Sequence, residues 1–221
     1  MSAPSRCSDP IAVLTQGLSD LLQRTPKAEE LEQFQRYLDL LIQWNTVHRL
    51  TAYRHQGEIV QKLLLDSLLF LKVLPPSALQ VLDYGAGAGI PGIPLKIVLP
   101  QIILTLVEAR RNRVSFLMAV LRELGFQGVT ILHGRGEQLL EERQAIRAAF
   151  DAVVVRAVGP LSGIVSTALS FLKPGGVVIA SGPPASGKTP TLPGDIRASW
   201  KFVTSRWSPS PRRFLLVEKE D

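Results

Sequence analysis

The stretch Leu79-Gln80-Val81-Leu82-Asp83-Tyr84-Gly85-Ala86-Gly87-Ala88-Gly89 decides how the rest of the chain is interpreted. It begins with the pattern of a buried strand and runs directly into three glycines at alternate positions. Glycine permits positive φ and leaves room for a ligand against the backbone, and a helix that follows offers free amide groups. Asp83, at the carboxyl end of the strand, can accept hydrogen bonds from the turn or from a ligand's ammonium group. The stretch therefore predicts a cofactor-binding turn in an α/β sheet.

Short apolar runs alternate with helical ones after Pro76, which is typical of strands joined by crossover helices in a parallel sheet. The turn Ser208-Pro209-Ser210-Pro211 is too short for a parallel crossover, so the strands on either side of it are predicted to pair as an antiparallel hairpin. The expected sheet thus has seven strands and is mostly parallel. The strands are expected at 79–83, 102–107, 129–132, 152–155, 176–181, 200–206 and 213–218, with helices at 92–99, 111–124, 137–149 and 160–172.

Two helical segments precede the sheet. Apolar residues recur at helical spacing over 29–47, and a second helix is predicted over 57–73, before Pro75-Pro76. We expect three parts: a mobile N-terminus over 1–28, a helical extension over 29–76 and the α/β domain over 77–221.

Composition favours a basic cytoplasmic protein. The 221 residues carry a net charge of +6, and the excess lies toward the C-terminus, where residues 173–221 contain eight basic and four acidic side chains. Such a balance is compatible with a nucleic-acid partner, although many basic proteins bind none. No apolar run reaches the roughly 18 residues of a membrane span, and the N-terminus lacks the apolar core of a secretory signal, so no membrane partner is expected. With Cys7 as the single cysteine, neither a disulfide framework nor a cysteine metal site is predicted.

Two cofactors compete for the glycine turn. The run Gly87-Ala88-Gly89-Ile90-Pro91-Gly92 also satisfies the dinucleotide pattern G-x-G-x-x-G, with Glu108 about 20 residues further on. Both NAD and S-adenosylmethionine favour an acid there for their ribose hydroxyls. S-adenosylmethionine is favoured by Asp83 two residues before the first glycine, by Leu172-Lys173-Pro174-Gly175-Gly176 before the fifth strand and by the terminal hairpin.

A second glycine motif is interpreted as a coincidence. Residues 182–189 match the phosphate-loop pattern G-x-x-x-x-G-K-[ST]. That loop works through backbone amides and an immediately following helix, whereas Pro183 and Pro184 have no N–H and Pro190 and Pro193 oppose a helix. We expect a surface loop over 182–195.

Several further motifs share one family's spacing over about residues 35–219. That family is the bacterial small-subunit ribosomal RNA guanine-N7 methyltransferases, also known as glucose-inhibited division protein B, which the sequence resembles. The Gly-Ile-Pro-Gly-Ile-Pro continuation of the turn is more specific than three glycines alone. The matching pieces are Trp44-Asn45, Leu50-Thr51-Ala52, Asp66-Ser67-Leu68, Asp83 to Pro94, Arg113-Val114-Ser115-Phe116-Leu117, Arg135-Gly136-Glu137, Phe150-Asp151, Val155-Arg156-Ala157 and Arg213-Phe214-Leu215-Leu216-Val217.

This resemblance implies a class I S-adenosylmethionine-dependent methyltransferase fold, which is Rossmann-like, with residues 77–221 as the methyltransferase domain. It implies methylation of guanine N7 in 16S ribosomal RNA, and 16S RNA or the small subunit as partner. We expect no catalytic side chain, because guanine N7 already offers a lone pair. We also expect no oligomer and no metal. Cofactor contacts are expected from Asp83, Gly85, Gly87, Gly89, Ile90, Glu108, Gly136, Glu137 and Arg156, and RNA contacts from Arg156, Arg212 and Arg213.

The sequence also departs from the family pattern. Leu63 stands where a histidine is expected, and Ser181-Gly182 stands where a lysine-glycine pair usually follows the fifth strand. These departures keep open a non-catalytic factor that binds RNA or the ribosome during assembly. The dinucleotide pattern keeps a second alternative open, an NAD-dependent oxidoreductase. His48, His55 and His133 are interpreted as surface or packing residues.

Overall fold

A seven-stranded sheet forms the centre of the computed structural model, which describes residues 9–156, 161–181, 197–208 and 210–220. The strand order is β3-β2-β1-β4-β5-β7-β6. Strands β1 to β5 are parallel, and β7 runs antiparallel to both β5 and β6. The predicted, mostly parallel sheet with a terminal hairpin is confirmed. The strands are β1 (Gln80–Tyr84), β2 (Ile103–Glu108), β3 (Val129–His133), β4 (Phe150–Arg156), β5 (Leu172–Ser181), β6 (Arg197–Val203) and β7 (Arg212–Glu218).

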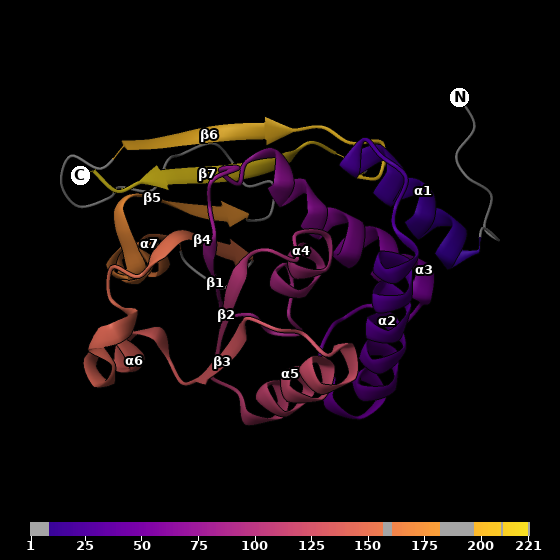
Figure 1. The fold of residues 1–221 in the computed structure, drawn as a ribbon, viewed down its shortest axis with the longest axis horizontal. Helices are drawn as coiled ribbons and strands as arrows, with labels where there is room; N and C mark the ends of the chain where they lie inside the picture. Colours follow the sequence, from indigo (N-terminus) through magenta and orange to yellow (C-terminus); the bar gives the residue numbers. More distant parts are fainter. Residues whose placement is uncertain (1–8, 157–160, 182–196, 209, 221) are drawn as a thin grey trace.

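Helices cover both faces of the sheet (Figure 1). One face is covered by α6 (Gly136–Glu142), the short 3-10 helix η3 (Gln144–Ile146) and α7 (Leu161–Phe171), and the other by α4 (Gly92–Val98), α5 (Arg111–Leu124) and the N-terminal helices. Successive residues of a strand point to opposite faces, so Val154 joins the core of the N-terminal helices while Val153 and Val155 join that of α6 and α7. Buried on both faces, these strands have the apolar composition that a doubly covered parallel sheet requires.

The N-terminal helices are α1 (Pro10–Leu22), α2 (Ala28–His48) and α3 (Gln56–Ile59), followed by the π-helix η1 (Val60–Leu65) and the 3-10 helix η2 (Leu68–Lys72). The segment predicted as one continuous helix over 57–73 is helical over nearly that range, but it is divided into α, π and 3-10 parts, so the prediction of a single helix is wrong. Residues Val60 and Leu63 to Leu65 are all buried, so this segment packs on several sides rather than along one stripe. Such packing can override the regular hydrogen-bond spacing of an α-helix.

Helix α1 corrects the prediction of a mobile N-terminus for residues 10–22. Asp9 caps it by accepting a hydrogen bond from the amide of Ile11 at 3.0 Å, and Pro10 occupies the first turn. Leu14 and Leu18 are fully buried in the main core. The Asp-Pro start was a helix signal that the sequence interpretation passed over, and residues 1–8 lie outside the described part of the chain.

Other boundaries differ modestly. The helix predicted over 137–149 ends at Glu142 and gives way to η3, and β6 begins at Arg197, three residues earlier than predicted. The loop expected over 182–195, with its phosphate-loop pattern, lies outside the described residues. Among the residues that are described, no helix combines the length and the apolar composition needed to cross a membrane.

Candidate functional site

The glycine-rich turn follows β1 and is fixed to the neighbouring strand. The amides of Gly85 and Ala86 both donate to the carbonyl of Val107 at 2.9 Å. Gly85, Gly87 and Gly89 have φ of 78°, 60° and 83°, a backbone region that favours glycine. A Cβ at Gly89 would also lie 2.5 Å from a side-chain carbon of α4. The alternate glycines are thus required by the path of the turn.

The helical extension contacts this turn directly. Tyr37 of α2 is fully buried, and its hydroxyl donates to the carbonyl of Ala88 at 2.5 Å. Burial, with the nearby Asp83 carboxyl as a second cause, raises the pKa of this phenol, so it stays a hydrogen-bond donor. The turn is therefore supported by α2 as well as by the sheet.

Asp83 lies fully buried beneath the turn. Its Oδ2 accepts a hydrogen bond from the amide of Gly92 at 2.8 Å, at the start of α4. Its Oδ1 is buried without a hydrogen-bond partner among the described residues. Burial raises the pKa of this carboxyl to about 7, although the bond from Gly92 opposes the change. An unsatisfied buried acceptor is costly, and a cationic donor from a ligand would relieve it.

Glu108 ends β2 opposite the turn and is almost fully buried. Its Oε2 accepts from the amide of Gly87 at 2.8 Å, and its Oε1 accepts from the amide of Arg110 at 2.8 Å. Arg113 lies 3.7 Å from the same carboxylate. A crevice of about 370 Å³ opens here, at the carboxyl ends of the first three strands, and its lining includes Gly85, Glu108, Gly136 and Glu137. The structure thus brings these four predicted residues together.

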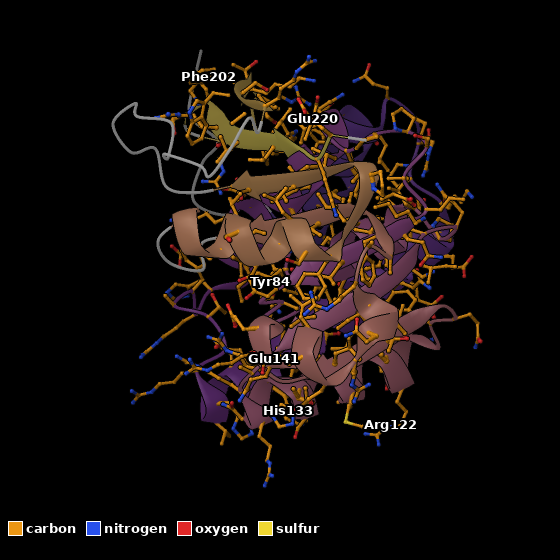
Figure 2. The ribbon with its side chains drawn as sticks, turned by 90° about the vertical axis from the view of Figure 1, so that its left-hand side faces the viewer. Tyr84, Arg122, His133, Glu141, Phe202 and Glu220 are labelled. Atoms are coloured by element: carbon orange, nitrogen blue, oxygen red, sulfur yellow. The ribbon has the colours of Figure 1, made fainter. Side chains whose placement is uncertain are left out.

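Gly136 and Glu137 form the far wall of the crevice at the start of α6. A Cβ at Gly136 would lie 2.2 Å from the ring of Tyr84, so no larger residue fits without displacing that ring. The Tyr84 hydroxyl and the Thr167 hydroxyl each donate to Oε1 of Glu137 at 3.1 Å. The residue's own backbone amide, with these two hydroxyl bonds, lowers the pKa of Glu137, although burial opposes the change. Figure 2 shows Tyr84 between the helices that cover this face.

Ile90 belongs to the core shared with the N-terminal helices, and only 8% of it is exposed. Like Asp83, Gly87 and Gly89, it is not part of the lining of the crevice described above. Its contact with a cofactor stays a prediction.

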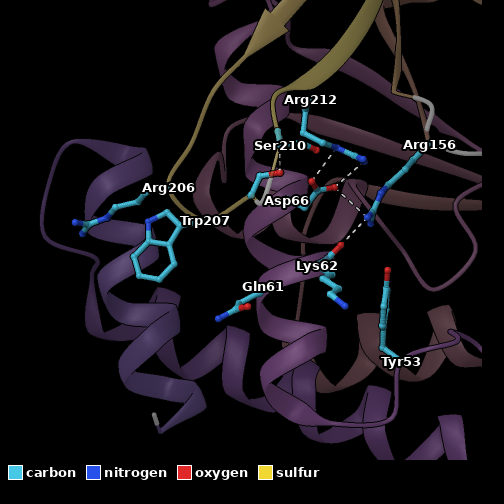
Figure 3. Close-up of a pocket in the computed structure, with 10 residues that line it drawn as sticks. Tyr53, Gln61, Lys62, Asp66, Arg156, Arg206, Trp207, Ser210 and Arg212 are labelled. Atoms are coloured by element: carbon cyan, nitrogen blue, oxygen red, sulfur yellow. Dashed lines mark hydrogen bonds and ion pairs between the residues drawn. The ribbon is translucent and has the colours of Figure 1, made fainter. Parts of the chain in front are cut away.

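A second cluster gathers around Asp66, at the ends of β4 and β7 (Figure 3). Arg156 Nη2 lies 3.0 Å from Asp66 Oδ2 and also donates to the carbonyl of Lys62 at 2.6 Å. Arg212 reaches both carboxylate oxygens, at 2.9 Å each, and donates to the Ser181 hydroxyl at 3.2 Å. One buried carboxylate therefore holds two guanidinium groups, in the wall of a cavity of about 530 Å³. Arg156, predicted to contact the cofactor and RNA, lies in this cavity.

Arg212 and Arg213 point to opposite faces of the sheet. They are adjacent in β7, so their side chains alternate. The Arg213 guanidinium lies 4.3 Å from the ring of Trp200 and 5.6 Å from that of Phe202. The structure therefore places Arg212 with Arg156 and places Arg213 away from both.

Several residues that line the cavity were missed as site residues from the sequence. Lys62 and Asp66 are four residues apart, and this spacing on a helical segment was the available signal. Tyr53 and Trp207 also line the cavity, and no sequence feature marked them. Asp66 is part of the family motif Asp66-Ser67-Leu68, but the sequence assigned it no role.

Two of the histidines, His133 and His48, contact a backbone carbonyl and a neighbouring ring. His133 Nε2 lies 3.2 Å from the carbonyl of Ala109, and the His48 ring packs 5.2 Å from that of Trp44. Within the described ranges, no three His, Cys, Asp or Glu side chains gather as they would around a metal ion.

Comparison with protein families gives a match over residues 30–182 to the model described as GidB, rRNA small subunit methyltransferase G. A protein named Ribosomal RNA small subunit methyltransferase G, from Caldanaerobacter subterraneus, is 42% identical over 171 residues, covering 77% of this chain and 71% of its own length. The protein of the same name from Lactococcus lactis subsp. cremoris is 36% identical over 154 residues, covering 69% of this chain and 64% of its own length. The chain thus spans about two thirds of the length of these relatives.

Solved structures match the fold at lower identity. A putative O-methyltransferase from Klebsiella pneumoniae superposes with a TM-score of 0.57 at 17% identity, over 95% of this chain and 97% of its own. The O-methyltransferase TomG from Streptomyces achromogenes, solved in complex with SAM, superposes with a TM-score of 0.55 at 18% identity, over 95% of this chain and 96% of its own. The fold is accordingly that of class I methyltransferases.

Proposed function

The chain belongs to the rRNA small subunit methyltransferase G family, and from that membership we propose that it transfers a methyl group from S-adenosylmethionine to N7 of a guanine in 16S ribosomal RNA. The single observation that carries the proposal from the structure is the crevice at Gly85 and Glu108, together with Asp83, two residues before Gly85, whose Oδ1 is buried without a hydrogen-bond partner among the described residues. The family membership supplies the reaction, and the crevice supplies a place for the cofactor.

The residues present fit S-adenosylmethionine. The unpartnered Oδ1 of Asp83 would accept from its ammonium group. Glu108 would accept from the ribose hydroxyls, as acids at the end of the second strand do in related nucleotide sites. Gly136 and Glu137 would border the adenine. Because Gly136 has no Cβ, its backbone can lie directly against the ring of Tyr84.

When bound, S-adenosylmethionine supplies an electrophilic methyl group. Guanine N7 carries a lone pair and no proton, so no side chain has to act as a general base. The residues therefore have to align the base and accept a product with added positive charge. Arg156 and Arg212, held on Asp66, would bind a phosphate next to the target base.

The substrate is proposed to be the small ribosomal subunit or its 16S RNA, and we expect the protein to act in the cytoplasm, where that substrate is. We also propose residues 29–76 as an extension and residues 77–221 as the methyltransferase domain. Relatives with methyltransferase names do not favour the oxidoreductase alternative. Of the two departures, Ser181 accepts a hydrogen bond from Arg212 in the Asp66 cluster, and Leu63 follows Lys62, whose carbonyl accepts one from Arg156.

The test is transfer of labelled methyl groups to small subunits purified from cells that lack this methylation, followed by digestion to nucleosides. We expect 7-methylguanosine to carry the label. Asp83→Ala should abolish transfer and S-adenosylmethionine binding together. Label in another nucleoside would refute the acceptor but keep the cofactor, whereas binding of the cofactor with no transfer would support the non-catalytic alternative.

A further inference from the structure

The cavity beside Asp66 extends to the turn between β6 and β7. Its lining includes Arg206, Trp207 and Ser208 from that turn and Tyr53 from the loop after α2. Figure 3 shows Trp207 and Tyr53 on opposite sides of the Asp66 cluster. The cavity thus reaches well beyond the groups that would hold one phosphate.

Helix α1 holds this turn in place. Asp20 Oδ2 accepts from Nε1 of Trp207 at 2.8 Å and from Nε of Arg206 at 2.6 Å. Trp207 is half-buried against the main core, whereas Arg206 is largely exposed, and its guanidinium lies 5.1 Å from the indole ring. Because α1 is anchored by the buried Leu14 and Leu18, the turn is fixed to the body of the protein.

The charges around the cavity fit a polyanion. Four cationic side chains line it, from Lys62, Arg156, Arg206 and Arg212, and Asp66 is the acidic residue of the lining. Asp20 and Glu58 pair with Arg206 and Lys62 from outside the lining. Its volume of about 530 Å³ is in the range of pockets that take a nucleotide-sized ligand. Unpaired RNA bases stack on aromatic rings and on guanidinium planes, and this turn presents one of each.

We propose that the Arg206–Trp207 pair contacts an unpaired base that flanks the target guanine, and that Asp20 is a positioning residue for this pair. This inference rests on the proposed function, because it assigns part of the same RNA substrate. Asp20, Arg206 and Trp207 all lie outside residues 30–182, the segment that matches the family model. The contact therefore involves the first helix and the last hairpin, outside the segment that matches the family model.

The first experiment measures steady-state methyl transfer to unmethylated small subunits, and the affinity for a single-stranded, guanine-containing RNA octamer by fluorescence anisotropy. Trp207→Ala should raise KM for subunits and Kd for the octamer roughly tenfold. It should leave kcat and S-adenosylmethionine affinity unchanged, and Trp207→Phe should restore most of the loss. Phe202→Ala removes an exposed aromatic side chain on β6 and is the matched control. An unchanged KM and Kd in Trp207→Ala, or an equal loss in Phe202→Ala, would overturn the proposal.

The variant Asp20→Ala distinguishes a positioning role of Asp20 from a purely electrostatic effect of its carboxylate. Removing an acid beside a polyanion site should strengthen binding if only electrostatics matter. We expect weaker octamer binding instead, because the indole and guanidinium lose their common anchor. Tighter binding would contradict the positioning role.

A spectroscopic measurement keeps the test independent of turnover and of truncation at Trp207. In protein that retains Trp207 as its one tryptophan, through Trp44→Phe and Trp200→Phe, saturating octamer should quench the indole emission. Unchanged emission would overturn the base contact. If the wild-type protein transfers no methyl group to subunits, the proposed function fails, whereas octamer affinity and quenching still decide the contact at Trp207.

Discussion

Replacing Asp83 with asparagine should remove a pH dependence from the stability of the free protein. The folded state raises the pKa of this carboxyl from 3.8 to about 7, chiefly through burial. Between these two values the folded chain holds a proton that the unfolded chain has lost. Protonation of Asp83 therefore favours the folded state fully at low pH, and this advantage is lost as pH rises through about 7.

The magnitude follows from the two pKa values. Their difference corresponds to roughly 4 kcal/mol in total, and about 3 kcal/mol of this should disappear between pH 5 and pH 8. An asparagine does not titrate, so the variant should lack this component. At pH 8 it escapes the cost of a buried charge, although its amide group must find a partner of its own.

The assay is denaturant unfolding of the cofactor-free protein at pH 5 and pH 8. The free energy of unfolding of the wild type should fall by about 3 kcal/mol more than that of Asp83→Asn over this interval. Asp39→Asn, on the exposed side of α2, makes the same chemical change and should behave like the wild type. Parallel pH profiles for the wild type and Asp83→Asn would refute the reasoning.

Four further outcomes are expected. The affinity of the wild type for S-adenosylmethionine should rise from pH 6 to pH 8 in calorimetry, because the ammonium group pairs with ionised Asp83. Gly136→Ala should lower the free energy of unfolding by about 1–3 kcal/mol, because its Cβ would meet the Tyr84 ring at 2.2 Å. Asp66→Ala should cost about 3–5 kcal/mol in denaturant unfolding, since it leaves two largely buried guanidinium groups without their carboxylate. Leu18→Ala should cost about 2–5 kcal/mol, because α1 is part of the core.

Matched controls accompany the last three substitutions. Gly163→Ala adds a Cβ that meets nothing within 4 Å and should not destabilise. Glu58→Ala removes one partner of an exposed ion pair with Lys62 and should change the free energy of unfolding by less than about 1 kcal/mol. Leu79→Ala truncates a side chain on a residue that is 52% exposed. Equal losses in a variant and its control would contradict the corresponding prediction.

Local signals predicted much of the fold. The helix at 111–124 was placed with its observed bounds, because Gly125 ends it in a left-handed conformation. The antiparallel hairpin followed from the short turn between its strands. The segment after α3 was harder, since its residues pack on several sides and tertiary contacts choose π and 3-10 geometry there.

The site was predictable where its residues follow directly from the order of the parallel strands. The glycines after β1 and the acid at the end of β2 meet because parallel strands end at one edge. The Asp66 cluster depends on contacts between distant elements, and Arg212 joins it while Arg213 does not, because side chains alternate along β7. Registers of this kind are set by three-dimensional packing, so motif matching alone could not separate the two arginines.

The bond between Asp20 and Trp207 joins positions 187 residues apart in the chain. During synthesis at roughly 5–20 residues per second, α1 would leave the ribosome about 10–40 s before its partner turn is made. Until then the apolar side of α1 lacks part of the surface that it packs against in the folded protein. An apolar surface exposed in this way can associate with chaperones or other chains. The last hairpin therefore closes the structure, and a chain halted before residue 207 would keep its first helix only partly secured.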